Sequence, residues 1–397
     1  MIQEFFNVGT SSAHVQVAVV IAILVIALVV TFSQKSGPPL EISQLYIYPV
    51  KSLRGCRLEK AYIGRYGLLG DRTFCLQRIH RDEDGNLTRH ETMLIGYYLQ
   101  LALFRTAIDL KDQGENMANA QIRVSWHGAG SEFGASDASV DSDQSIQFPL
   151  VPSLEGRSEV QVDLHGSSCA AYDMGDEISQ WFTDRLGFEI RLVHIGNGSR
   201  PVLGTLAPHS RGGLKKARLV RRIRATVPFL AQPEERLAFN DIAHYLVVTE
   251  ESNRQVSSRL DGDSTMDVTK FRPNIVVQGS PGAFVEDYWG EITFDGGIEM
   301  PLTANCYRCQ SITVDYDTGK TATDDRGAVW KKLNKDRRVD KGAKYSPVFG
   351  RYGYCFESTV GKELFVGQTA QVTYINKERT HFDWPALTTF GVTQTKK

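Results

Sequence analysis

The longest apolar run of the chain lies near its N-terminus, at residues 15–32. The run carries no charge, and Gln16 and Thr31 are its only polar residues. A helix of this length spans about 27 Å, just enough for the hydrocarbon core of a bilayer. The pattern predicts one transmembrane anchor, preceded by a short segment at 1–14. A cleaved signal peptide is the alternative, but residues 1–14 lack Lys and Arg, and no clear small-x-small cleavage site follows.

Positive charge flanks the predicted anchor only on its C-terminal side, at Lys35 and then at Lys51 and Arg54. By the positive-inside rule, the body of the protein is expected to face the cytosol. Residues 33–40, which include SGPPL, are expected to form a short, stiff linker between anchor and body.

Beyond the linker, most segments alternate between apolar and polar positions, which is typical of β-strands. EDGNLTRH at 83–90 predicts a hairpin with a tight turn. DEISQWFTDRLG at 176–187 has helical spacing and ends in Gly187, and HYLVVTEESNRQVSSRL at 244–260 predicts a strand followed by a helix. The expected fold class is α+β and β-rich, with at least one barrel-like sheet.

The body divides into two halves joined by a basic segment. The first half, 41–196, contains a polar stretch at 112–158 that predicts a flexible surface insertion. The connecting segment, 197–238, includes RGGLKKARLVRRIR, which has seven cationic residues and no acid. The second half covers 239–376, and the tail at 377–397 shows no clear period.

Composition narrows the classes of protein. With 397 residues, 42% of them hydrophobic, the chain can bury a sizeable core, as two domains or two packed halves. A formal net charge of −1 gives no sign of nucleic-acid binding, so partners must be sought in local patches. The six cysteines are scattered, which favours reduced thiols in a reducing compartment over a disulfide scaffold.

Cys306 and Cys309 form a C-x-x-C motif within ANCYRCQSITVDYDTGK. A structural zinc site needs four protein ligands, and no second C-x-x-C is present. Thioredoxin chemistry places the motif at the start of a helix, whereas QSITVDYDTG has the pattern of a strand that runs into a turn. Covalent haem requires His at the position of Gln310. One thiolate on a soft metal that is held mainly by a cofactor is compatible with the motif.

The stretch around Cys309 resembles the MOSC-domain signature of the molybdenum-cofactor enzymes related to the mitochondrial amidoxime-reducing component. Arg308-Cys309 precedes the T-x-D-x-D-T-G residues of that signature. Four further motifs match in order: YPVKS at 48–52, GDR at 70–72, FRPN at 271–274 and SPVFGRYG at 346–353. The resemblance covers Ile42 to about Val372. It implies a MOSC N-terminal β-barrel domain at 41–196 packed with a MOSC domain at 239–376.

The resemblance also implies a set of cofactor-binding residues. Cys309 would supply the thiolate to molybdenum, and Arg308 would help to keep it deprotonated. The cofactor carries a phosphate, which calls for buried cations and hydrogen-bond donors. The implied cofactor-binding residues are Lys51, Ser52, Arg72, Arg272, Asn274 and Arg308.

Other residues near the motifs are given plainer roles. Cys306 is expected to be a small buried residue or a nearby thiol that does not ligate the metal. Asp315 and Asp317 are expected to build a turn with Gly319. The chain departs from the family pattern at 240–244, so side-chain contacts from that segment to the cofactor are in doubt. His244 could donate a proton, although a structural histidine is the preferred interpretation.

The function implied is that of a membrane-anchored oxidoreductase that reduces N-hydroxylated substrates such as amidoximes and hydroxylamines. Electrons would come from a b5-type cytochrome and its NADH-dependent reductase, because the chain has no G-x-G-x-x-G fingerprint. The basic stretch at 211–224 would be a solvated face, a docking surface for that donor, or a contact with anionic lipid. By analogy, the mitochondrial outer membrane is favoured over the endoplasmic reticulum. The alternative is a carrier module that delivers molybdenum cofactor or sulfur to another molybdoenzyme.

Overall fold

The computed structural model describes residues 38–109, 119–128, 144–217, 219–226, 231–262 and 264–389. The predicted anchor at 15–32 lies outside these residues, as do the segment at 1–14 and the first part of the linker. Within the described ranges, no helix has the length and apolar character needed to cross a membrane.

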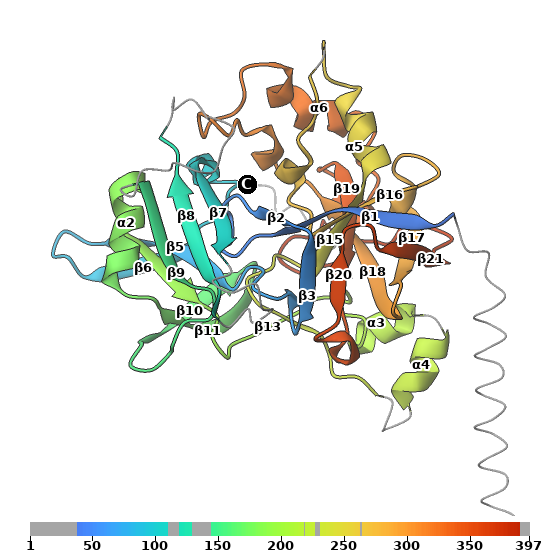
Figure 1. The fold of residues 1–397 in the computed structure, drawn as a ribbon, viewed down its shortest axis with the longest axis horizontal. Helices are drawn as coiled ribbons and strands as arrows, with labels where there is room; N and C mark the ends of the chain where they lie inside the picture. Colours follow the sequence, from blue (N-terminus) through green and yellow to red (C-terminus); the bar gives the residue numbers. More distant parts are fainter. Residues whose placement is uncertain are drawn as a thin grey trace, which may run out of the picture.

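A closed barrel of seven strands forms the larger part of the molecule (Figure 1). Its strands follow the order β16-β15-β19-β18-β17-β21-β1, and β1 closes the ring by pairing with both β21 and β16. The strands are β1 (Leu40–Ile47), β15 (Tyr245–Thr249), β16 (Ile275–Gln278), β17 (Trp289–Phe294), β18 (Ile298–Tyr307), β19 (Val348–Gly353) and β21 (Thr369–Ile375). The short β2 (Cys56–Leu58) extends the sheet beyond β1.

Both faces of strand β15 are buried, which explains why every residue of the strand except Thr249 is apolar or aromatic. Val247 belongs to the cluster inside the barrel. The next residue, Val248, packs outside it with Val256 of α5 (Glu250–Ser257) and Leu333 of α6 (Val329–Asn334). The barrel therefore has an apolar interior and a second apolar layer beneath these two helices.

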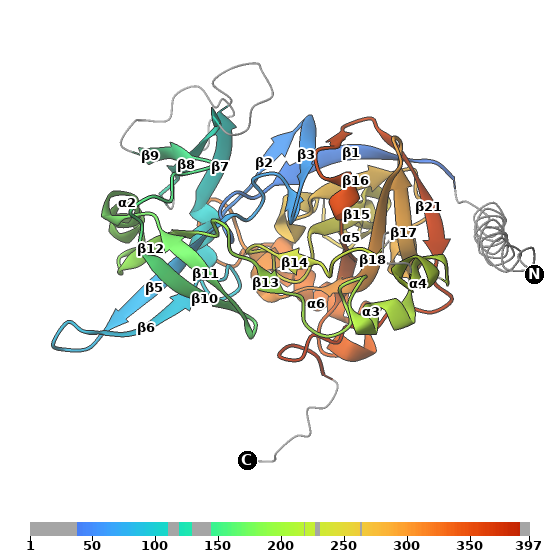
Figure 2. The same ribbon diagram turned by 90° about the horizontal axis from the view of Figure 1, so that it is seen from below.

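The N-terminal half forms two smaller antiparallel sheets beside the barrel (Figure 2). The five-stranded sheet has the order β10-β11-β12-β5-β6, and the three-stranded sheet has the order β7-β8-β9. Their strands are β5 (Phe74–Arg81), β6 (Leu87–Thr92), β7 (Phe104–Asp109), β8 (Gln121–Trp126), β9 (Ser145–Pro149), β10 (Glu159–Leu164), β11 (Ser167–Asp173) and β12 (Ile190–His194). Helix α2 (Asp176–Leu186) packs on β12 and ends at Gly187, whose φ is 78° and whose N–H donates to Thr183.

Short elements complete the described chain. The remaining strands are β3 (Lys60–Gly64), β4 (Gly67–Leu68), β13 (Arg200–Pro201), β14 (Arg236–Leu237) and β20 (Glu363–Phe365), and the remaining α-helices are α3 (Arg211–Lys216) and α4 (Leu219–Thr226). The 3₁₀ turns are η1 (Leu99–Leu103), η4 (Val268–Phe271), η5 (Val285–Tyr288), η6 (Gln310–Thr313), η7 (Asp325–Ala328), η8 (Lys341–Ala343) and η9 (Glu357–Thr359).

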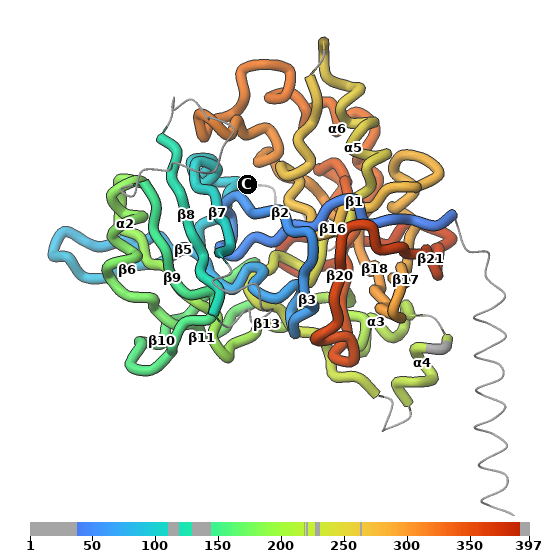
Figure 3. The backbone as a smooth tube through the Cα atoms, in the orientation of Figure 1, coloured from blue at the N-terminus to red at the C-terminus, as the bar shows by residue number. Residues whose placement is uncertain are grey.

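The β-rich class, the barrel-like sheet, the hairpin and the two predicted helices are confirmed. The closed barrel, however, takes six of its seven strands from the second half of the chain and only β1 from the first. Figure 3 shows this path, with the blue β1 lying among the orange and red strands of the barrel.

The prediction of a flexible insertion at 112–158 is wrong for its described parts. Ile122 and Val124 of β8 and Phe148 of β9 are buried in the core of the N-terminal half. The polar average of the whole stretch hides two short runs that each bury an apolar face. Residues 112–118 and 129–143 of this stretch lie outside the described ranges.

Glu286 makes the stability of this fold depend on pH. It is fully buried in η5 and accepts a 2.6 Å hydrogen bond from the hydroxyl of Ser252 in α5. Burial raises the pKa of Glu286 to about 7, although the Ser252 hydrogen bond opposes the shift. Because Glu in an unfolded chain titrates at about 4.3, the folded protein binds more protons between the two values. This contribution to stability therefore falls as pH rises through that window.

We expect Glu286→Gln to remove this loss, since Gln stays neutral and its oxygen can still accept from Ser252. In urea unfolding, the free energy of unfolding of the native protein should decrease by up to about 3 kcal/mol from pH 5 to pH 8, and the variant should not show this decrease. The exposed Glu378 provides the control substitution, Glu378→Gln. An unchanged pH dependence in Glu286→Gln would contradict this assignment.

Candidate cofactor cleft

A cleft beside the end of the barrel collects most of the residues implied to bind cofactor. Its walls come from both halves of the chain. The lining residues are Arg72, Asn240, Asp241, Ala243, Tyr245, Leu246, Phe271, Arg272, Asn274, Cys306, Arg308 and Tyr352. Residues from the GDR, FRPN and cysteine motifs, far apart in the sequence, thus meet around one space.

Three residues of this site have a backbone conformation that is unfavourable for side chains other than glycine. Ser52, Arg72 and Arg272 have φ angles of 72°, 50° and 57°. They are three of the five non-glycine residues with positive φ in the described chain. Backbone hydrogen bonds hold two of them: the N–H of Arg72 donates to Tyr48 and that of Arg272 to Thr269. Strain of this kind clusters at binding sites, where it aims side chains.

Tyr48 is the platform for two arginines. The guanidinium carbons of Arg72 and Arg272 lie 4.5 and 4.4 Å from the centre of its buried ring. Arg72 donates to Asp71 at 2.6 Å and to Asn274 at 2.9 Å. Arg272 donates to the carbonyl of Leu53 at 2.6 Å. Both cations are therefore fixed in direction by stacking and by hydrogen bonds.

The cleft has more buried positive charge than its own acids balance. Arg272 and Arg308 make no ion pair with any described carboxylate, and both bind backbone carbonyls instead. Burial lowers the pKa of Arg272, and the neighbouring Arg72 cation lowers it further. The buried Nε atom of Arg308 has no described hydrogen-bond partner. An anion in the cleft would relieve these costs.

Lys51 adds a fourth cation behind the cleft. Its side chain is 5% exposed, donates to the carbonyl of Phe239 at 3.0 Å and forms an ion pair with Asp241. Partial burial opposes ionisation of Asp241, whose side chain is 52% exposed, but the Lys51 and His165 partners outweigh it and hold the pKa of Asp241 well below its usual range. Burial also lowers the pKa of Lys51, against the pull of Asp241.

Ser52 and Asn274 serve mainly as ties within the protein. Ser52 donates to the carbonyl of Met93 at 3.0 Å and accepts from the N–H of Ile95 at 3.1 Å. Asn274 accepts from the N–H of Leu246 as well as from Arg72, and its amide donates to Tyr46. Their hydrogen-bonding capacity is largely used, so they position neighbouring segments around the cleft.

Cys309 is exposed and directly follows Arg308, which lines the cleft. Its Sγ lies 2.9 Å from the hydroxyl of Ser311 and next to Gly96, where an added Cβ would stand 3.5 Å from the sulfur. The expected strand after Cys309 is wrong: η6 begins at Gln310, and both Ser311 and Thr313 are buried, so alternation fails there. This turn leaves the thiol open to ligands from solvent.

Cys306 differs from Cys309 in its burial. It is buried, and Arg308 Nη1 lies 2.9 Å from its sulfur. Burial raises the pKa of the Cys306 thiol. All six cysteines are free in the structure, so the motif forms no disulfide. The expectation that Cys306 is a buried thiol is confirmed.

Asp315 organises the turn that follows η6. Its carboxylate accepts from the N–H groups of Asp317 and Thr318, each at 3.0 Å. Gly319 has a φ of 63°, and a Cβ there would meet Leu103 at 2.9 Å. The expected structural turn is confirmed.

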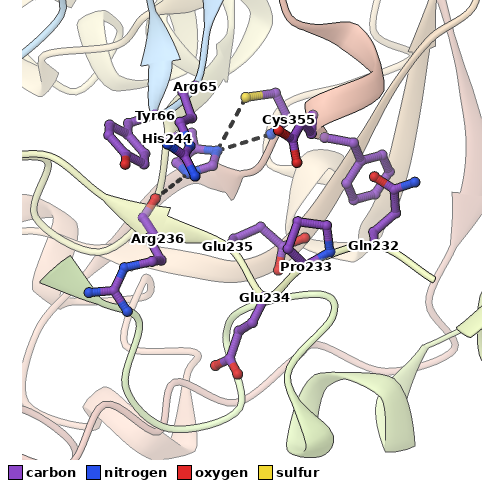
Figure 4. A pocket seen from close by; sticks show the side chains of 11 residues that line it. Arg65, Tyr66, Gln232, Pro233, Glu234, Glu235, Arg236, His244 and Cys355 are labelled. Carbon is purple, nitrogen blue, oxygen red and sulfur yellow. Dashed lines mark hydrogen bonds between the residues drawn. The ribbon is translucent and has the colours of Figure 1, made fainter. Parts of the chain in front are cut away.

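His244 lines a separate pocket together with Arg236 and Cys355 (Figure 4). Its Nε2 lies 2.7 Å from the carbonyl of Arg236, so this nitrogen carries the hydrogen. Its Nδ1 accepts from the N–H of Cys355 at 3.2 Å. The same Nδ1 lies 3.3 Å from the sulfur of Cys355, and neither Arg236 nor Cys355 lines the cleft. His244 is therefore a structural histidine.

Sequence reasoning gave no role to Tyr48, Asp71, Asp241 or Tyr352. Tyr48 and Asp71 belong to the YPVKS and GDR motifs, so these motifs could have identified both residues as part of the site. Asp241 follows a buried Asn240 in the segment that departs from the family pattern. Tyr352 lies within the SPVFGRYG motif and lines the cleft.

The residues present fit an anionic cofactor that brings most of its own metal ligands. Four cations (Lys51, Arg72, Arg272 and Arg308) face two carboxylates (Asp71 and Asp241), an excess that suits a phosphate. Among described residues, no group of three or more His, Cys, Asp or Glu could hold a bare metal ion. A single exposed thiolate therefore fits a metal that is already chelated.

Comparison with known proteins identifies both halves. The family model described as "MOSC N-terminal beta barrel domain" matches residues 40–189. The model described as "MOSC domain" matches residues 234–372. The chain is 27% identical over 322 residues to mitochondrial amidoxime-reducing component 1 of Mus musculus, covering 78% of this chain and 76% of that protein. The Homo sapiens protein of that name is 26% identical, covering 78% and 77%.

A second kind of relative matches the same region. The chain is 27% identical over 296 residues to the molybdenum cofactor sulfurase of Oryza sativa subsp. japonica. The match covers 72% of this chain but only 30% of that protein.

We expect Asp241→Asn to lower the free energy of unfolding by about 1–2 kcal/mol at pH 7, because buried Lys51 loses its charged partner while solvent screens the half-exposed Asp241. The pKa of Asp241 is depressed, so its contribution is present above the unfolded value of about 3.9 and lost as pH falls toward the folded value. Urea unfolding measures the free energy of unfolding of the native protein and of Asp241→Asn, and the difference between them should be smaller at pH 3.5 than at pH 7. Glu155→Gln, at an exposed position, is the matched control. If the free energies of unfolding of the native protein and Asp241→Asn differ by the same amount at both pH values, the ion pair is contradicted.

We expect His244→Ala to lower the free energy of unfolding by about 2–4 kcal/mol, since it leaves a cavity and two buried backbone groups unpaired. Cofactor content of the folded fraction should stay unchanged. Thermal unfolding and metal analysis of the folded protein measure the two effects, with the exposed His90→Ala as control. Loss of activity without loss of stability would instead indicate a proton donor.

Proposed function

The chain belongs to the family of MOSC-domain proteins, and from that premise we propose that it is a molybdenum-cofactor oxidoreductase that reduces N-hydroxylated substrates. One observation carries the proposal: an exposed thiol, Cys309, stands beside a cleft with excess buried positive charge. That pairing suits a cofactor with an anionic tail and an accessible metal. The names of the amidoxime-reducing relatives support the choice of substrate class.

Four residues would hold the cofactor through charge. Lys51, Arg72 and Arg272 would bind its phosphate, the arginines as forks already aimed by Tyr48. Arg308 would neutralise charge near the thiolate of Cys309. When bound, the molybdenum cofactor supplies the two-electron chemistry that removes the oxygen of an N–OH group.

The remaining residues of the site would position and admit reactants. Ser311 would orient the Cys309 sulfur through its hydroxyl at 2.9 Å. Ser52 would hold the loop that leads to Gly96, beside that sulfur. Each turnover consumes two electrons and two protons, and yields the reduced nitrogen and one water. The exposure of Cys309 lets solvent supply the protons and lets a protein donor approach.

A b5-type cytochrome, reduced by its NADH-dependent reductase, is the proposed electron donor. The proposed anchor at 15–32 would hold the body on the cytosolic side of a membrane. The mitochondrial outer membrane is the proposed location, supported by the word "mitochondrial" in the names of relatives.

A carrier of molybdenum cofactor or sulfur is the second candidate. The match to a molybdenum cofactor sulfurase over 30% of that protein favours it, because a MOSC-type region there is part of a larger chain. Bound cofactor without reductase activity would support the carrier.

We expect the full-length chain, produced in a host that synthesises molybdenum cofactor, to contain near-stoichiometric molybdenum and pterin. It should reduce benzamidoxime with a supplied electron donor. Cys309→Ala should lower turnover at least about a hundredfold, since the metal loses its protein ligand. Cys56→Ala, at a partly buried cysteine that does not line the cleft, is the matched control and should retain metal and activity.

Three outcomes separate the candidates. Metal and activity that depend on Cys309 support the reductase. Tight cofactor binding without reduction, despite competent electron supply, supports the carrier. Zinc in place of molybdenum, lost in Cys309→Ala, would refute both.

A further inference from the structure

The basic helices α3 and α4 divide their cations into two sets. Lys216, Arg221 and Arg224 pair with acids of the body, at 3.3, 2.5 and 3.8 Å from Asp383, Glu291 and Glu299. These pairs dock α4 on the barrel wall and α3 on the C-terminal segment. Arg211, Lys215 and Arg222 are exposed and make no ion pair with any described residue. The second set is therefore available to an anionic partner.

An apolar hollow lies close to these helices, at the ends of β17 and β21. Arg221 binds Glu291 of β17, and β17 pairs with β21. Beside Trp289 and Ile375 of these strands is an apolar hollow that also includes Pro38 and Leu40. Ile375 is half-exposed. Cationic and apolar surfaces thus adjoin where the described chain begins.

Leu219 gives α4 itself an apolar contact surface. Its side chain is 60% exposed, on the same short helix as Arg222. Exposed apolar side chains interspersed with Arg and Lys are typical of elements that lie at a bilayer interface. If the helix contacted only solvent, an exposed leucine such as Leu219 would not be expected on it.

These helices lie far from the thiol that would bind the metal. Glu299, which pairs with Arg224, precedes Cys309 by ten residues along β18 and its extension. Ten residues at about 3.3 Å each give a path of up to about 33 Å along this segment. Figure 1 shows the same relation, with α4 at the bottom and α6, which packs on η6, at the top. An electron donor docked on α3 and α4 would be too distant for efficient transfer, because tunnelling falls off exponentially with distance.

We propose that α3, α4 and the adjoining apolar hollow form a membrane-contact surface that binds anionic lipid headgroups. Charge complementarity selects the partner: three unpaired cations face outward, with no described acid in either helix. Each basic residue near an anionic leaflet strengthens binding about fivefold. This surface would orient the body with Cys309 directed away from the lipid. The inference does not depend on the proposed reductase activity.

Amide hydrogen exchange of the full-length chain tests the surface. The chain is reconstituted with vesicles of phosphatidylcholine alone or with added phosphatidylserine. Exchange in peptides from 211–226 should be at least about fivefold slower with phosphatidylserine, and high salt should abolish the difference. Peptides from β18 report that the barrel stays folded.

Charge reversal locates the effect. The variant Arg211→Glu/Lys215→Glu/Arg222→Glu should lose the slowing. The matched control Lys320→Glu/Lys331→Glu/Lys335→Glu reverses three exposed lysines in the part of the chain that follows Cys309 and should keep it. Equal exchange in both lipids, or equal loss in both variants, would overturn the proposal. Slowing that requires an added acidic b5-type haem protein, in neutral lipid, would overturn it in favour of donor docking.

Discussion

The closure of the barrel by β1 is the constraint on which the cleft depends. β1 pairs with β16 and β21, so its C-terminal end is fixed against strands that follow it by more than two hundred residues. The chain then turns and brings Tyr48, Lys51 and Ser52 to the cleft. A one-residue slip of β1 would turn its buried face outward. The same slip would displace the aromatic platform beneath Arg72 and Arg272, so barrel closure and site geometry are one property.

Excess buried charge distinguishes this cleft from an ordinary domain interface. Arg272 and Arg308 each donate to a carbonyl oxygen, which fixes their direction without neutralising them. Apolar residues of similar size would stabilise such an interface at least as well. The positive φ angles of Arg72 and Arg272 add a further cost. At Arg272, where the strain and the uncompensated charge coincide, both are explained together if an anion binds there.

Alternation of apolar and polar positions predicted the β-rich fold class, because it is a local signal. The residues that line most of the cleft came from motifs that resemble those of a known family, and their role in cofactor binding stays a prediction. The sequence could not assign the barrel strands, since pairing between β1 and β21 depends on contacts across the whole chain. The prediction of a strand after Cys309 was wrong because Ser311, Ile312 and Thr313 are all buried, whereas a half-buried strand alternates between buried and exposed positions. Partners such as Asp241 for Lys51 have no sequence signal, because a half-exposed acid in a loop resembles any other.

The separation between Cys309 and the basic helices follows from the length of β18. Its ten residues carry Glu299 near one end and lead to Cys309 beyond the other. Surfaces at opposite ends of one rigid strand cannot serve the same partner. If lipid occupies the basic end, substrate and electron donor must approach the other end from the aqueous phase. The thiol then needs the exposure that η6 gives it, and the barrel becomes a spacer between membrane and chemistry.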